Sequence, residues 1–167
     1  MGLLEGFILW AQEFAGSWGY LGIFLVNFLG SATILFPVPA FMVVFLFGGI
    51  LNPWLVGIWA GIGCALGELT GYLIGKGGEK VLKKKYKKWI LKGEKWFRNH
   101  RAFPFIVIFA ATPLPDDVLG ILCGMFSYDL KKFLLASLIG KIIMNLALAW
   151  GGFYGLNWIL QAFGGGV

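Results

Sequence analysis

Two long apolar stretches constrain this chain most, because each is long enough to cross a lipid bilayer as a helix. Residues 54–75 read WLVGIWAGIGCALGELTGYLIG, and residues 129–156 include KKFLLASLIGKIIMNLALAWGGFYGL. The first alone would extend about 33 Å at a rise of 1.5 Å per residue. Hydrophobic residues make up 59% of the chain, which is more apolar surface than a soluble domain of 167 residues can bury. The sequence therefore predicts an all-α integral membrane protein with one membrane domain, residues 1–167, in the plasma membrane.

Two further apolar regions are each interrupted by a Pro-x-Pro pair. The prolines are Pro37 and Pro39 in residues 17–53, and Pro113 and Pro115 in residues 102–128. Proline stops a helix, and the apolar piece after each break would extend only ~15–18 Å, about half a bilayer. We therefore expect each region to form a re-entrant helical hairpin, with a helix that spans over residues 17–36 as the alternative for the first.

The two Pro-broken regions match in register. Gly48 follows the first proline pair by nine residues, Gly124 follows the second by nine, and the second motif lies 76 residues after the first. A long apolar stretch follows each region, so the pattern predicts an internal repeat of hairpin plus transmembrane helix. Because a re-entrant hairpin adds no crossing, the two repeats are expected to be inverted, as in many secondary transporters.

Positive charge is concentrated between the two predicted repeats. Eleven of the 14 Lys and Arg residues fall in residues 76–101, which predicts a basic cytoplasmic segment by the positive-inside rule. Its aromatic and apolar residues favour an amphipathic helix on the membrane over a solubilising loop, since they can share one face: Leu82, Tyr86, Trp89, Trp96 and Phe97. Such a segment indicates anionic membrane lipids, and not nucleic acid, as partners.

The remaining parts of the chain carry no sign of catalysis. Residues 1–16 have apolar residues at helical spacing and predict an interfacial amphipathic helix. Cys64 and Cys123 lie in apolar stretches without a metal-ligand pattern, and His100 is the single histidine. We find no nucleophile or phosphate-loop motif, so we expect neither an enzyme nor a metal or other cofactor.

Three segments in order resemble the DedA family of membrane proteins, also called VTT-domain proteins. They are GELTGYLIGKGG at residues 67–78 and the segments FPVPAFMVVFLFGG and ATPLPDDVLGILCG around the two proline breaks. The resemblance implies a polytopic protein that moves lipids. Bacterial relatives are implicated in recycling polyprenyl-phosphate carriers with proton coupling, and eukaryotic relatives in phospholipid scrambling.

This chain departs from the family pattern at the hairpins. Bacterial members carry an acidic residue where Ala40 stands here, and arginines where Ala110 and Asp116 stand. Those arginines are natural phosphate ligands, because a guanidinium binds phosphate through two hydrogen bonds. In this chain Lys141 could replace them only as a point charge.

Ionisable groups inside a bilayer cost about 2.5–3.5 kcal/mol each, so those in the apolar stretches are our candidate site residues. The candidates for binding substrate or ions are Glu68, Asp116, Asp117, Lys141, Asn145 and Asn27. We expect Lys141 to pair with one of the three carboxylates, although the two aspartates could instead cap a helix. Ser137, Lys141 and Asn145 follow one another at a spacing of four residues, so they should form one polar stripe.

These observations favour a DedA-type transporter of an anionic lipid between leaflets, with the proton as a candidate coupling ion. An ion- or proton-coupled transporter of a small solute could use the same residues. A membrane scaffold that recruits partners through its basic helix is the third interpretation. Because a chain of 167 residues is small for sealing a pathway, we expect a homodimer.

Overall fold

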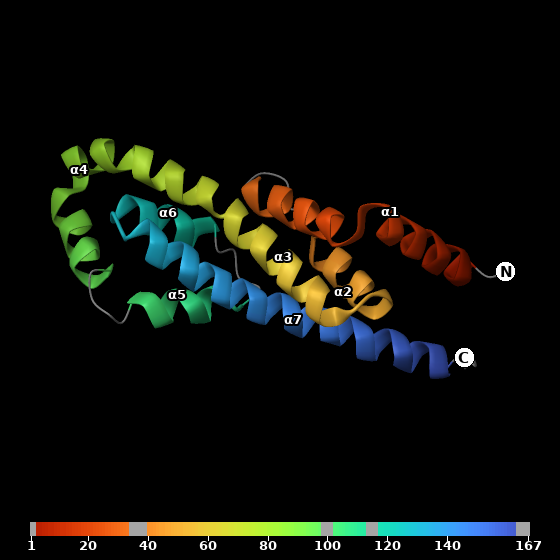
Figure 1. The fold of residues 1–167 in the computed structure, drawn as a ribbon. Coiled ribbons are helices and arrows are strands. Elements are labelled where there is room, and N and C mark those ends of the chain that lie inside the picture. Colours follow the sequence, from red (N-terminus) through yellow and green to blue (C-terminus); the bar gives the residue numbers. More distant parts are fainter. Residues whose placement is uncertain (1–2, 34–39, 98–101, 113–116, 163–167) are drawn as a thin grey trace.

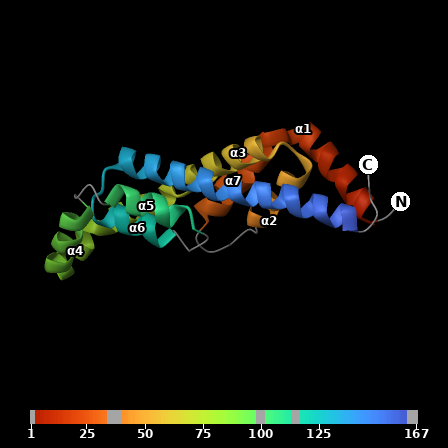
Figure 2. The same ribbon diagram turned by 90° about the horizontal axis from the view of Figure 1, so that it is seen from below.

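The computed structural model describes residues 3–33, 40–97, 102–112 and 117–162, and every regular element in this part is an α-helix. The helices are α1 (Leu3–Ala32), α2 (Ala40–Ile50), α3 (Pro53–Gly67), α4 (Leu69–Phe97), α5 (Ala102–Ala110), α6 (Asp117–Met125) and α7 (Leu130–Ala162). They form an elongated bundle, in which α1 begins and α7 ends at one end and α4 turns at the other (Figures 1 and 2). The predicted all-α class is confirmed.

Two helical segments are long and apolar enough to cross a bilayer, Pro53–Glu79 and Leu130–Leu156. They contain the two predicted spanning stretches, pack against each other, and run in opposite directions (Figure 1). The first passes from α3 into α4 at Glu68. The apolar part of α1, Trp18–Ala32, and helix α2 are both shorter than the ~20 residues that a spanning helix needs.

Two helices contain a residue with non-helical backbone angles. Gly19 divides α1 with φ 51° and ψ −145°, a left-handed φ that glycine adopts without strain. This break lies close to the predicted boundary between residues 16 and 17. Tyr86 divides α4 with φ −125° and ψ 39°. The structure has no break at the predicted boundary between residues 75 and 76, because the apolar helix runs on into the basic segment as far as Tyr86.

The helices of the two Pro-broken regions pack in a symmetrical pattern on the two long segments. Helix α1 packs on α3 and α5 packs on α7, whereas α2 packs on α7 and α6 packs on α4. Glycines make these crossings close. A Cβ atom at Gly48 would overlap the backbone of Ala149, and one at Gly124 would overlap the backbone of Tyr72. Gly48 and Gly124 are the two glycines that the sequence pairs.

The buried apolar side chains form two clusters, one around each crossing. The cluster around α2 is mainly aliphatic and comprises Ile23, Val44, Phe47, Val56, Ala60 and Ala149. The cluster between α4, α6 and α7 is richer in aromatic rings and comprises Tyr72, Phe97, Ala102, Ile106, Leu119, Cys123, Tyr128, Phe133 and Ala136. The predicted single aromatic face of the basic segment is therefore wrong, because Phe97 is buried in this cluster while Trp89 is 78% exposed.

Candidate functional site

A buried ion pair lies between the two long helical segments. Lys141 Nζ, near the middle of α7, is 3.0 Å from Glu68 Oε1, and the two side chains are only 5% and 3% exposed. Glu68 stands between α3 and α4, where its backbone N–H donates to Cys64 O at 3.0 Å and its carbonyl accepts from Tyr72 N at 3.1 Å. Unbroken backbone hydrogen bonding therefore fixes the carboxylate in the middle of the first segment.

Both hairpin regions contact residues that flank this ion pair along the chain. Thr70, one half-turn after Glu68, donates its hydroxyl to Ala32 O at the end of α1. Gly140, next to Lys141, packs against Ala110 at the end of α5, and Gly120 of α6 packs against the backbone of Glu68. The pair thus lies where the two Pro-broken regions meet the long segments.

Two asparagines and a cysteine extend the polar site toward α1. The Cys64 thiol lies 3.6 Å from Asn27 Oδ1 and 3.9 Å from Asn145 Nδ2, so it bridges the two amides. Asn27 Nδ2 donates to Ile23 O, and Asn145 Nδ2 donates to Lys141 O, both at 2.8 Å. The two asparagines and the cysteine are almost fully buried, which makes this a continuous polar interior.

Two polar atoms in this interior lack a hydrogen-bond partner among the described residues. They are Ser137 Oγ and Asn145 Oδ1, and Glu68 Oε1 meets Lys141 as an ionic contact without directed hydrogen-bond geometry. Buried acceptors without partners are costly, so such atoms commonly bind water or a ligand. Ser137 and Asn145 lie one turn to either side of Lys141 and are fully buried, as the predicted polar stripe requires.

The structure brings together four of the six predicted site residues: Glu68, Lys141, Asn145 and Asn27. Asp117 is the first residue of α6, but its side chain is outside the described part. Also outside it are Asp116 and the four break prolines, Pro37, Pro39, Pro113 and Pro115. Sequence reasoning missed Cys64 as a site residue, although its position one helical turn before Glu68 places it on the same face. Among the described residues, no group of three His, Cys, Asp or Glu could hold a metal ion.

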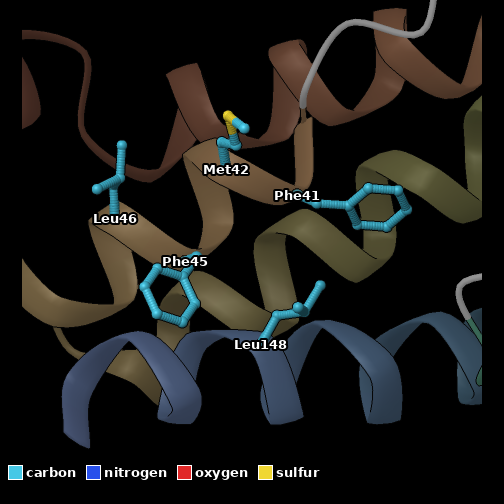
Figure 3. Close-up of a pocket in the computed structure, with 5 residues that line it drawn as sticks. All are labelled: Phe41, Met42, Phe45, Leu46 and Leu148. Carbon is cyan, nitrogen blue, oxygen red and sulfur yellow. The ribbon is translucent and has the colours of Figure 1, made fainter. Parts of the chain in front are cut away.

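An apolar pocket of about 360 Å³ opens between α2 and α7 (Figure 3). Its walls are Phe41, Met42, Phe45 and Leu46 of α2 and Leu148 of α7. Leu148 follows Lys141 by seven residues, two helical turns, so the two lie on the same side of α7 about 10 Å apart along its axis. A charged site and an apolar pocket therefore follow each other along one helix.

The fold and this interior define an α-helical membrane protein with a charged, polar centre. The family model of the VTT domain matches residues 38–154, so the chain belongs to the VTT-domain, or DedA, family. The resemblance found in the sequence is thereby confirmed.

Three curated relatives extend the comparison. The chain is 31% identical to the uncharacterized protein MJ0201 of Methanocaldococcus jannaschii over 132 residues, 77% of this chain and 80% of the relative. It is 28% identical to the membrane protein YbfM of Bacillus subtilis, over 79% of this chain and 87% of the relative. It is 24% identical to the inner membrane protein YqaA of Escherichia coli, over 81% of this chain and 92% of the relative. No solved structure matches the chain.

Proposed function

We propose that this protein translocates an anionic lipid between the leaflets of the plasma membrane, with Lys141 as the ligand of the phosphate. The buried ion pair carries the proposal. An ionisable pair at the centre of a spanning segment is expensive and by default marks a substrate or ion pathway. When the Lys141–Glu68 contact opens, the ammonium of Lys141 can bind an anionic head group in place of the carboxylate.

The neighbouring apolar pocket supports a lipid over a small solute. A lipid needs a charged contact for its head group and an apolar surface for its chain. The Lys141 ammonium and the pocket beside Leu148 supply these two surfaces on one side of α7. The buried acceptors Ser137 Oγ and Asn145 Oδ1 could accept hydrogen bonds from water that moves with the head group.

We propose that the two hairpin regions are re-entrant and belong to inverted repeats in a protein that crosses the membrane more than once. The packing pattern supports this arrangement: each first helix packs on the long segment of its own half, and each second helix packs on that of the other half. The end of α1 then contacts Thr70, close to Glu68, and the end of α5 contacts Gly140, next to Lys141. In inverted-repeat transporters the broken helices likewise lie beside the substrate site near the midplane.

The test is head-group translocation in liposomes with a labelled anionic lipid. Single changes at the pair could damage folding, so the decisive variant is Lys141→Gln combined with Glu68→Gln, which removes both charges, keeps the shape of residue 68 and leaves a shorter polar side chain at residue 141. We expect this variant to insert and remain monodisperse but to lose lipid movement. Ile143→Ala, on the exposed side of α7, is the matched control and should translocate like the parent.

Two results would overturn the proposal. Unchanged lipid movement in the double variant would show that the pair is structural. Flux of a small solute without lipid movement in the parent would favour the coupled solute transporter. The scaffold interpretation would be favoured if neither lipid nor solute moved and a protein partner were bound. We further propose that this transporter has no enzymatic step. The homodimer stays a prediction, and the mass of the protein in nanodiscs would test it.

The inverted arrangement has its own measurement. Lys84 is exposed on α4, and Trp158 is 70% exposed toward the end of α7. A cysteine at Lys84 should react with an impermeant reagent only from the cytoplasmic side, and a cysteine at Trp158 only from outside. Reaction of both from one side would disprove the arrangement and leave the lipid proposal to the liposome assay.

A further inference from the structure

A second apolar hollow lies at the opposite end of the bundle from the start of α1 and the end of α7 (Figure 1). It has a volume of about 420 Å³ and is lined by Tyr86, Trp89, Ile90, Met125 and Phe126. The first three belong to α4 at its break at Tyr86 and just after it, Met125 is the last residue of α6, and Phe126 follows it. The volume falls in the range of ligand clefts, between ~300 and 1,000 Å³.

The hollow exists because α4 folds back onto the end of α6 after Tyr86. Gly93 lies against the ring of Phe126, where a Cβ atom would overlap it. Phe97, one turn further along, packs against the same ring at a tilt of 34°, with centroids 5.2 Å apart. Ile90 is 2% exposed and anchors the same stretch. These contacts hold the hollow open beside a fixed helix.

A smaller basic hollow adjoins the apolar one. It is lined by Lys88, Trp89 and Lys92, so the Trp89 ring is a wall of both hollows. Lys88 and Lys92 are one helical turn apart and both exposed, and no carboxylate lines either hollow among the described residues. Trp89 is 78% exposed, which is typical of a tryptophan at the membrane–water interface.

We propose that these two hollows form one binding site for a single anionic phospholipid of the adjacent leaflet. The phosphate lies between the ammonium groups of Lys88 and Lys92, and an acyl chain lies in the hollow lined by Met125 and Phe126. Basic pockets beside membrane helices bind anionic lipid head groups in this way. The site is separate from the Lys141 centre, and its lipid stays bound instead of crossing.

A bound lipid here would hold α4 against α6. Beyond the break at Tyr86, the distal part of α4 is attached to the bundle through Ile90, Gly93, Trp96 and Phe97. A lipid that contacts both helices adds to that attachment. The site would therefore stabilise the protein in anionic membranes more than in neutral ones.

The experiment counts lipids retained by the purified full-length protein with native mass spectrometry. Phosphatidylglycerol and phosphatidylcholine of the same chains are compared for the parent, for Lys88→Gln with Lys92→Gln, and for Lys84→Gln with Lys95→Gln. The second pair is the matched control, since it removes the same charge from exposed lysines on the same helix that line neither hollow. We expect the first pair to weaken phosphatidylglycerol binding roughly tenfold or more and the control to leave it close to the parent.

The apolar half of the site is tested with Trp89→Ala, using Trp158→Ala, which is also largely exposed, as its control. We expect loss of retained lipid only in the first. Equal loss from both lysine pairs would overturn the proposal in favour of diffuse attraction, as would equal retention of the two lipids. The proposal would also be overturned if glycerol phosphate protected the protein against thermal unfolding as strongly as phosphatidylglycerol does. The acyl chain would then contribute nothing to binding.

Discussion

The second helices of the two hairpin regions, α2 and α6, cross the opposite long segment alike but fill the adjacent space differently. Beside α2 the space stays open as the pocket next to Leu148. The residue 76 positions before Leu148 is Tyr72, beside α6. Its ring is 5% exposed, stacks on Phe133 at 5.3 Å between centroids, and donates its hydroxyl to Tyr128 O at 2.5 Å.

The comparison shows how the side chain at one matching position, Tyr72 or Leu148, decides whether the space beside the crossing helix is filled or open. The tyrosine ring occupies the volume beside α6 and its hydroxyl ties α4 to the start of α7. A leucine at the matching place is too short to fill the space beside α2. Among the described residues near the Lys141 centre, the apolar pocket therefore lies on the α2 side.

The largest loss of stability should come from breaking the Lys141–Glu68 ion pair, which lies close to both hairpin regions. Lys141→Ala leaves the Glu68 carboxylate buried without its cation, and loss of one member of a buried pair typically costs ~3–5 kcal/mol. Thermal unfolding in detergent should show this loss, and Glu68→Ala in the same chain should recover part of it. Absence of any recovery in the double variant would show that the two charges are not coupled.

The next largest loss of stability should come from substitutions at Gly48 and Gly124, where the helices cross closely, and the loss should be similar at both positions. Gly48→Ala and Gly124→Ala each push a methyl group into the backbone of the opposite helix, and overpacking of this kind costs ~1–3 kcal/mol. Gly77→Ala is the control, because nothing lies within 4 Å of its Cβ position and alanine favours the helix. A stable Gly124→Ala variant beside an unstable Gly48→Ala variant would break the equivalence of the crossings.

The sequence predicts the long helices, the proline-bounded regions and the paired glycines, because these depend on composition and spacing alone. It also places Lys141 and Asn145 on one stripe by helical periodicity. It leaves three carboxylates open as partners of Lys141, since the choice depends on how α3 and α7 cross. Cys64 lies one helical turn before Glu68, so the same periodicity could have placed it on the face of the site. The burial of Phe97 depends on the packing of α4 beside Phe126, a tertiary contact that no local pattern encodes.

The hydrogen bond of the Tyr72 hydroxyl to Tyr128 O should contribute moderately to the free energy of unfolding. Tyr72→Phe keeps the ring but leaves the Tyr128 carbonyl without its hydroxyl donor, and an unsatisfied buried group costs ~1–3 kcal/mol. Tyr154→Phe, at a tyrosine that is 65% exposed, should leave the unfolding temperature unchanged. Equal stability of the two variants would remove the hydrogen bond from the explanation of the difference between the halves.

The smallest effect on stability should come from making the two halves alike. Leu148→Phe places a ring in a pocket of about 360 Å³ that already exists, so no overpacking follows and the change should be within ~1 kcal/mol. Lipid translocation should nevertheless slow, because the ring occupies the surface proposed for the acyl chain. Leu135→Phe, at a leucine that is 53% exposed on the same helix, adds the same ring outside the pocket and should translocate like the parent. Full translocation by Leu148→Phe at unchanged stability would show that the open pocket is a consequence of a short side chain and not part of the lipid pathway.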